Sequence, residues 1–148
     1  MTSTARFCLH SLAVAAMSAL FVVSAGSAYA ADINVTVDGL ANDQGQVLVG
    51  LYNQASEFPK GKRIEDKITP AAKGAVTVVF KDVPAGQYAL SAFQDVNKNR
   101  RLDANMQGIP TEPIGASRDA RGRMGPPTFD DAVFTVGSAP LNLTIHLK

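Results

Sequence analysis

Four oxygen-bearing side chains recur at short intervals in the segment DVNKNRRLD, and their types are those that bind hard cations. Asp95, Asn97, Asn99 and Asp103 occupy relative positions one, three, five and nine. Calcium takes several oxygen ligands at about 2.3–2.6 Å, and a tightly turning loop can direct alternate side chains to one centre. The backbone carbonyl of Arg101, at position seven, is a fifth candidate ligand. The spacing predicts a calcium site formed by these five residues.

Two residues depart from the pattern of a regular calcium loop. Arg100 stands where a glycine would ease the sharp bend, and Met106 stands where a bidentate glutamate is expected. A further ligand could come from Glu112, Asp130 or Asp131, or from water. An imperfect loop with few carboxylates predicts weak binding, roughly 10⁻⁴ to 10⁻³ M, with a structural purpose. The alternative is a turn whose Asp and Asn side chains bond only to their own backbone.

The remaining residues give little support for catalysis. After the first thirty residues the chain has one histidine, His146, and no cysteine, so neither a nucleophilic triad nor a zinc set is indicated. We expect His146 to face solvent on a strand. The adjacent carboxylates Glu65 with Asp66, and Asp130 with Asp131, could serve as the pair that glycoside hydrolysis requires. We therefore expect a protein that is not an enzyme, with a hydrolase of envelope glycans as the alternative.

The first thirty residues have the pattern of a cleaved secretory signal peptide. Arg6 precedes a mostly apolar stretch over residues 9–23, and the sequence AGSAYA supplies the A-x-A pattern at Ala28 and Ala30. The apolar stretch is shorter than the roughly 20 residues that span a bilayer. Removal of residues 1–30 also removes the only cysteine. We therefore expect a periplasmic or secreted protein whose mature chain has neither a transmembrane segment nor a disulfide.

Composition favours a single soluble domain after this leader. The 148 residues include 14 Lys and Arg against 13 Asp and Glu, and 46% are hydrophobic. This near-neutral balance argues against nucleic acid as a partner, because such proteins have strongly basic surfaces. We expect residues 31–148 to form one domain, since a chain near this size buries about two-thirds of its unfolded surface. Its partner would be a ligand or protein of the envelope, which composition does not identify.

The elements that must position the loop have the period-two alternation of strands. Ile33, Val35 and Val37 alternate with polar residues, and residues 46–52 follow a turn at 42–45, so the pair predicts a β-hairpin. Similar alternation or β-branched content predicts further strands over residues 75–80, 88–94, 129–136 and 141–147.

The connections between these strands complete the predicted architecture. Residues 83–86 predict a tight turn, and the polar segment 53–74 predicts either a short helical turn near 56–58 or a seventh, edge strand. The connection over residues 95–128 is far longer than usual, which marks it as functional or specific to the fold. Six or seven short strands without an amphipathic helix predict an all-β fold: an antiparallel β-sandwich, immunoglobulin- or prealbumin-like, with one long loop excursion.

Several motifs in order make the chain resemble a bacterial exported family known as domain of unknown function 2141. They are the opening VTVDGLANDQGQVLVGLYN, the turn VPAGQYAL, the loop DVNKNRRLD, and the segments GIPTEPIGAS and GPPTFDDAVF. The positions that match the family pattern are Pro84, Gly86, Tyr88, Ala89, Asp95, Asn97, Asn99, Leu102, Asp103, Gly108, Ile109, Pro110, Glu112, Gly115, Pro126, Pro127, Phe129 and Ala132.

This resemblance implies an envelope β-sandwich with no established activity, and hence an exported binding or structural module. The chain departs from the family pattern at four positions. Gln94 replaces a histidine often found before the loop, Arg100 replaces the loop glycine, and Ile114 and Ala116 replace residues that are frequently aromatic.

Overall fold

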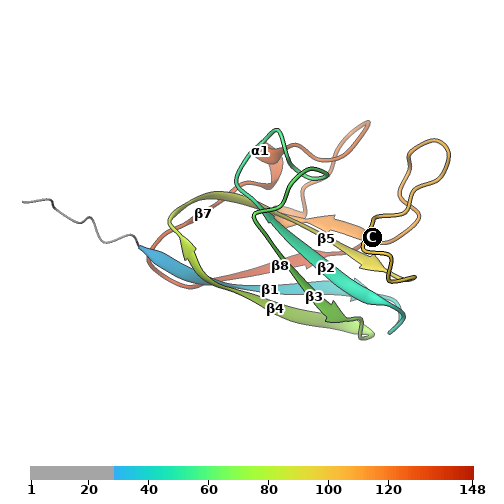
Figure 1. The fold of residues 1–148 in the computed structure, drawn as a ribbon, viewed down its shortest axis with the longest axis horizontal. Coiled ribbons are helices and arrows are strands. Elements are labelled where there is room, and N and C mark those ends of the chain that lie inside the picture. The colour runs from blue at the N-terminus through green and yellow to red at the C-terminus, as the bar shows by residue number, and fades with distance from the viewer. Residues whose placement is uncertain (1–28) are drawn as a thin grey trace, which may run out of the picture.

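Figure 1 shows the computed structural model of the chain, which describes residues 29–148. The signal peptide predicted over residues 1–30 lies almost entirely outside this described part. The strands are β1 (Ala30–Leu40), β2 (Gln46–Tyr52), β3 (Glu65–Pro70), β4 (Gly74–Pro84), β5 (Gly86–Asp95), β6 (Ile114–Ala116), β7 (Phe134–Val136) and β8 (Leu141–His146). A 3-10 turn, η1 (Ser117–Asp119), and a short helix, α1 (Phe129–Ala132), complete the elements.

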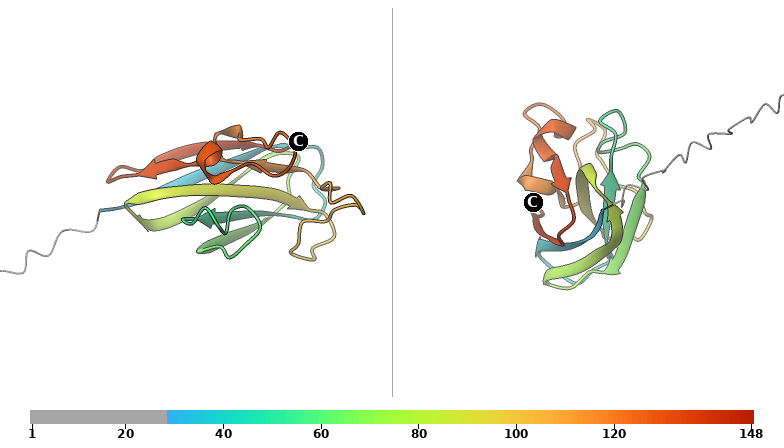
Figure 2. Two further views of the ribbon diagram at one scale, coloured as in Figure 1. Left: turned by 90° about the horizontal axis from the view of Figure 1, so that it is seen from above. Right: turned by 90° about the vertical axis from the view of Figure 1, so that its left-hand side faces the viewer.

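The strands form two sheets, which confirms the predicted all-β sandwich. One sheet has the order β4-β1-β8, and the other has the order β3-β2-β5-β6, with β7 also pairing with β5. The pairs are antiparallel except β1 with β8, which run parallel. Figure 2 shows the two layers from above and end-on.

The core lies between the two sheets and follows from the alternation of β1. Ile33, Val35 and Val37 have no exposed surface, while the residues between them face outward. They pack with side chains of β2, β4 and β5, and with Ile145 of β8, in one apolar cluster. Each buried large aliphatic side chain contributes roughly 1.5–3 kcal/mol through its removal from water, so this layer supplies much of the stability.

The predicted hairpin of β1 with β2 is wrong. β1 pairs with β4 and β8, whereas β2 pairs with β3 and β5 in the opposite sheet. The physical reason is that β2 is buried on both faces from Val47 to Tyr52. Such a strand needs neighbours on both edges and cover on both faces, which the centre of a sheet provides.

The predicted tight turn at residues 83–86 is a corner between the two sheets. β4 continues through Pro84 and β5 begins at Gly86, so only Ala85 separates them. The two strands belong to different sheets. The N–H of Ala85 donates to the carbonyl of Tyr29 at 2.8 Å, which attaches this corner to the start of β1.

The strand predicted over residues 129–136 is also wrong in its first half. Residues 129–132 form α1, and only residues 134–136 form a strand. Thr128 and Asp131 make a reciprocal capping box that favours a helical turn at this point. Within residues 29–148, no helix has the length and apolar character needed to cross a bilayer.

The segment over residues 53–74 contains both of the alternatives predicted for it. Residues 55–60 form turns, and β3 forms an edge strand. The inward-facing Lys67 of this edge strand pairs with Glu65 at 2.6 Å, and its Nζ lies 5.8 Å from the centre of the Phe80 ring. Charged side chains of this kind protect an open sheet edge from pairing with another chain.

The long excursion after β5 is divided by elements that return to the sandwich. β6 pairs with residues 91–93 of β5, and η1 follows it directly. Ile114 also exchanges two backbone hydrogen bonds with Lys148, at 3.1 Å each, beyond the end of β8. The loop over residues 96–113 therefore has both of its ends fixed. It extends from the end of the sandwich opposite to the start of β1 (Figure 1).

Candidate functional site

The predicted cation-binding segment begins at the last residue of β5. Asp95 is in register with Gln46 of β2, and Asp95 is completely buried. Its carboxylate accepts a hydrogen bond from Gln46 Nε2 at 2.8 Å. It also accepts from the backbone N–H of Asn99 at 3.0 Å and from that of Arg100 at 2.8 Å. Asp95 therefore fastens the first turn of the loop to the sheet.

Two effects act in opposite directions on the ionisation of Asp95. Burial raises the pKa of this carboxyl, whereas hydrogen bonds from the Gln46 side chain and from three backbone N–H groups of the turn lower it. The three groups belong to Arg100, Asn99 and Lys98. The hydrogen bonds prevail, so the pKa of Asp95 lies below its ordinary value and the buried group is an anion at neutral pH.

The two asparagines of the segment hold successive backbone turns. Asn97 Oδ1 accepts from the N–H of Asn99 at 3.0 Å, and Asn99 Oδ1 accepts from the N–H of Arg101 at 2.8 Å. Between these turns, Lys98 and Arg100 both have φ of 62°. This left-handed conformation is the reason why glycine is expected at the position of Arg100.

The same two asparagines meet at Asp103. Asn97 Nδ2 donates to one oxygen of Asp103 at 2.6 Å, and Asn99 Nδ2 donates to the other at 2.9 Å. The side chains at positions three, five and nine therefore converge on one point, as the spacing predicts. What faces Asp103 is the nitrogen of each amide, so the three side chains form a closed hydrogen-bonded set.

Glu112 closes the loop from its far end. It is 8% exposed, and its two carboxylate oxygens accept from the N–H of Val96 at 2.9 Å and from the N–H of Asp103 at 3.0 Å. Glu112 is one of the three acidic residues that the sequence offers as a further ligand. Its position is adjacent to the segment, but both of its oxygens already serve the backbone.

The structure thus brings together the predicted site residues in different ways. The side chains of Asn97, Asn99 and Asp103 bond to one another. The Asp95 carboxylate accepts from the backbone of the turn, and the backbone N–H of Arg101 donates to Asn99 Oδ1. In the described part of the chain, no group of three or more His, Cys, Asp and Glu side chains is placed to hold a metal ion. A cation here would therefore depend on the amide oxygens as well as on Asp103.

Gln94 lies beside this site and organises a second loop. Its side chain is buried, and its Nε2 donates to Asn42 Oδ1 at 2.9 Å and to the carbonyl of Gln44 at 2.8 Å. Gln94 therefore fixes the turn between β1 and β2. Neither this role nor that of Gln46 could be predicted, because both depend on which strands are neighbours.

The paired carboxylates considered for hydrolysis lie elsewhere. Glu65 and Asp66 are consecutive on β3, so their side chains point to opposite faces of the sheet. Asp131 is engaged in the capping box with Thr128, whose hydroxyl donates to it at 2.6 Å. Asp130 lines a groove in which the other lining residues are apolar or carry a hydroxyl.

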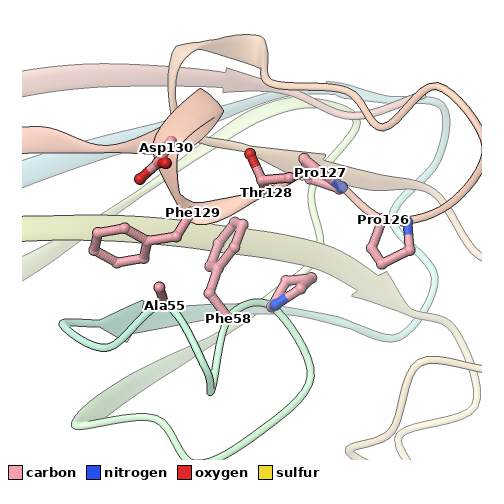
Figure 3. A pocket seen from close by; sticks show the side chains of 8 residues that line it. Ala55, Phe58, Pro126, Pro127, Thr128, Phe129 and Asp130 are labelled. Carbon is pink, nitrogen blue, oxygen red and sulfur yellow. The ribbon is translucent and has the colours of Figure 1, made fainter.

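This groove has a volume of about 340 Å³ and lies between residues 55–59 and residues 126–130. Figure 3 shows Ala55 and Phe58 on one side and the segment from Pro126 to Asp130 on the other. The Phe58 and Phe129 rings meet edge to face, with centroids 6.1 Å apart. Behind the groove lies a small apolar cluster on the outer face of the larger sheet. Each side of the groove has a Phe close to a Pro in the sequence, but the sequence does not show that these two segments meet.

His146 is exposed on β8, as predicted, but it has a partner that the sequence does not reveal. Its Nδ1 lies 2.8 Å from Asp119 Oδ2, and its backbone N–H donates to Asp119 Oδ1 at 3.0 Å. Burial raises the pKa of Asp119, but the hydrogen bonds from His146 and the charges of His146 and Arg121 lower it by more, so the net shift is downward. The pair connects η1 to β8.

Comparison with known proteins identifies one family. Residues 35–144 match the model of a family described as "Uncharacterized protein conserved in bacteria (DUF2141)". The match includes β2, β5, the whole loop after β5 and the groove residues near α1. No curated protein and no solved structure shows significant similarity to the chain.

Proposed function

The chain belongs to the bacterial family DUF2141, and we propose that it serves as an exported, non-catalytic module of the bacterial envelope whose loop over residues 95–103 takes up calcium weakly. The observation that carries this proposal is the convergence of Asn97, Asn99 and Asp103 on one point at the end of β5. The cation would serve to stiffen the base of the excursion.

The orientation of the Asn97 and Asn99 side-chain amides determines whether the loop can bind a cation. Rotation of the Asn97 and Asn99 amides by half a turn would direct their oxygens, instead of their nitrogens, toward Asp103. Three oxygen-bearing groups would then face one another, an arrangement that repels itself unless a cation lies between them. The rotation exchanges the places of the oxygen and the nitrogen in each amide and leaves each side chain in the same position.

The same rotation explains why binding should be weak. Asn97 Oδ1 and Asn99 Oδ1 now accept from the N–H groups of Asn99 and Arg101. A rotated amide presents its own N–H groups to these donors, so two turn-forming hydrogen bonds are lost when the cation enters. This loss, together with the engagement of Asp95 and Glu112 by backbone N–H groups, favours the millimolar class of affinity.

The carboxyl groups support a role without catalysis. A glycosidase needs a carboxylic acid whose pKa is raised so that it can protonate the leaving group. The carboxyls with clearly shifted pKa values in the described part are Asp32, Asp95, Asp119 and Asp131, and each of these pKa values is lowered. They also lie in separate places and not as a pair in one concave site.

The calcium proposal is tested by the melting temperature of the protein in calcium and in magnesium. We expect 10 mM calcium, roughly ten times the weak end of the extracellular range, to stabilise the fold by about 1.4 kcal/mol. Magnesium should do less, because it gives up its water reluctantly. Asp103→Asn should abolish the increment, while Asp43→Ala, which removes an exposed carboxylate from a neighbouring turn, should keep it. If calcium does not change the melting temperature of the wild-type protein, the segment is a turn without a calcium site.

The export proposal has a separate test. The pattern at Ala28 and Ala30 predicts cleavage after residue 30. Intact-mass measurement of the protein recovered from the periplasm or the medium should give the mass of residues 31–148. A protein that stays in the cytoplasm with its first thirty residues attached would contradict both export and the envelope role.

A further inference from the structure

The loop after β5 contains a small hairpin, which we name the tip hairpin (residues 104–110). Ala104 and Pro110 form an isolated antiparallel bridge at its base. Asn105 then closes it: the Asn105 N–H donates to the Ile109 carbonyl at 2.9 Å, and Asn105 Oδ1 accepts from the N–H of Gln107 and of Ile109. The shape of the tip hairpin is therefore fixed by its own hydrogen bonds.

The tip hairpin presents apolar side chains to solvent. Met106 is fully exposed and Ile109 is 60% exposed. The oxygen of the Asn105 side chain bonds to the backbone of the hairpin, while Asn105 and Gln107 are also exposed beside these two apolar residues. Single exposed apolar residues are common on soluble proteins. Two on one short hairpin, held outward by its internal bonding, form a candidate contact surface.

Over residues 95–113 the exposed charged side chains are all cations, whereas the carboxylates are buried or half-buried. Asp95 and Glu112 are buried, and their oxygens are occupied by hydrogen bonds. Lys98, Arg100 and Arg101 are exposed. The solvent-facing surface of this loop therefore combines cations with an apolar hairpin, although the neighbouring turn carries the exposed Asp43 and the whole chain is close to neutral.

We propose that this end of the molecule docks on an anionic lipid bilayer, with Met106 and Ile109 entering the interface and Lys98, Arg100 and Arg101 meeting lipid phosphates. A bilayer surface offers both features in adjacent layers, negative headgroups above apolar chains. A soluble polyanion would satisfy the cations and leave the apolar hairpin in water. The excursion projects from one end of the sandwich, so it can reach a membrane while the sheets stay in water (Figure 1). This inference goes beyond the proposed function and does not require calcium in the loop.

The absence of tryptophan from the chain makes a site-specific test available. Met106→Trp places a single fluorophore on the tip hairpin. Ser138→Trp places one in an exposed turn before β8, at the opposite end, because Leu141 pairs with Ile33 at the start of β1. Both full-chain proteins are mixed, in the presence of a chelator, with vesicles of phosphatidylcholine alone or of phosphatidylcholine and phosphatidylglycerol in equal parts. Brominated acyl chains serve as quenchers.

We expect the Trp at position 106 to shift its emission to the blue and to be quenched by the anionic vesicles only, and the Trp at 138 to stay unchanged. In the Met106→Trp background, Lys98→Gln and Arg101→Gln should each lower partitioning about fivefold, the factor that corresponds to about 1 kcal/mol per surface cation. Ile109→Ser should lower it as well. Far-ultraviolet circular dichroism confirms that each variant is folded.

Several results would overturn the inference. Co-sedimentation of both proteins without quenching at position 106 would show that residues 1–28 or another face binds the membrane. Equal quenching by neutral and anionic vesicles would show that the cations have no role in binding. No quenching by either kind of vesicle would show that the tip hairpin does not dock on a bilayer. Binding to soluble dextran sulfate without any response to anionic vesicles would assign the surface to a polyanion.

Discussion

Arg100 adopts a backbone conformation that costs an L-residue free energy. Its φ is 62°, in the left-handed region, and its side chain is exposed. Such a conformation costs roughly 1–2 kcal/mol for a residue with a Cβ, whereas glycine adopts it freely. The hydrogen bond from the N–H of Arg100 to the Asp95 carboxylate offsets this cost.

Arg100→Gly should therefore stabilise the protein by about 0.5–1 kcal/mol, after the greater flexibility of glycine in the unfolded chain is allowed for. Chemical denaturation measures the change. Arg101→Gly is the matched control: Arg101 is also exposed but has no positive φ, so that substitution should be neutral or destabilising. A loss of stability in Arg100→Gly would show that the side chain of Arg100 has a structural contact of its own.

Asp95 gives the fold a dependence on acid. Its pKa is lowered in the folded state, so its contribution to stability is complete above the unfolded value of about 3.9 and is lost as the pH falls through the folded pKa. Asp95→Asn should destabilise the protein at pH 7 by about 1–3 kcal/mol, because the amide cannot accept all the donors that face it. The gap between wild type and variant in the free energy of unfolding should narrow below about pH 4. A gap independent of pH would show that the charge is not what matters.

At this scale the sequence predicted which side chains gather but not how they bond. Alternating Asp and Asn residues place Asn97, Asn99 and Asp103 in one loop, with or without a bound cation. Spacing carries no information on whether an amide presents its oxygen or its nitrogen to Asp103. The contacts of Gln46 and Glu112 depend on strand pairing and on the return of the excursion, which short-range patterns do not contain.

Among the elements, the approach of the turn before β2 to the end of β5 leaves no room for a side chain. Gly45 has φ of 77°, and a Cβ at this position would overlap the Asp95 carbonyl and the Val96 backbone. Gly45→Ala should therefore cost at least about 2 kcal/mol, through both strain and collision. It should also loosen the attachment of the loop over residues 95–103 to the sheet.

Thermal unfolding of Gly45→Ala and of a control measures this effect. Gly137 lies in an exposed turn without positive φ, and a Cβ added there would meet no other atom within 4 Å. Gly137→Ala should therefore leave the melting temperature nearly unchanged. Equal effects of the two substitutions would contradict the close packing of β2 against the end of β5.

The strands were predicted better than their partners. Period-two alternation locates β1 and β8, each of which has one buried face, whereas β-branched and apolar content locates β2, which is buried on both faces. The hairpin of β1 with β2 was wrong because a turn signal cannot tell a return within one sheet from a crossing to the other. The strand predicted at residue 129 was wrong because the Thr128 and Asp131 capping box outweighs the preference of the apolar residues that follow.

For the molecule as a whole, β8 connects the first and last parts of the chain. Ile145 has no exposed surface and belongs to the core cluster. Ile145→Ala should lower the free energy of unfolding by about 2–5 kcal/mol, as other large-to-small changes in cores do. Thr144→Ala, its exposed neighbour on the same strand, should change it by less than about 0.5 kcal/mol. Similar values for both would place β8 at the periphery of the fold.

The fold class was accessible from sequence because the sandwich needs only several half-buried strands of ordinary length. The parallel pairing of β8 with β1 was not, because it joins residues more than a hundred positions apart. The groove between Phe58 and Phe129 was missed for the same reason. Both features arise from tertiary packing of segments whose local patterns are ordinary.

The claim that the loop takes up calcium is tested most directly by the side-chain amides of Asn97 and Asn99. A nuclear magnetic resonance titration with calcium follows their Nδ2 resonances together with the backbone N–H groups of Asn99 and Arg101. If the amides rotate to bind the cation, these four sets of signals should shift together and saturate in the millimolar range, and Asp103→Asn should abolish the shifts. Signals that stay in place, or that respond equally to magnesium, would contradict a calcium site in this loop.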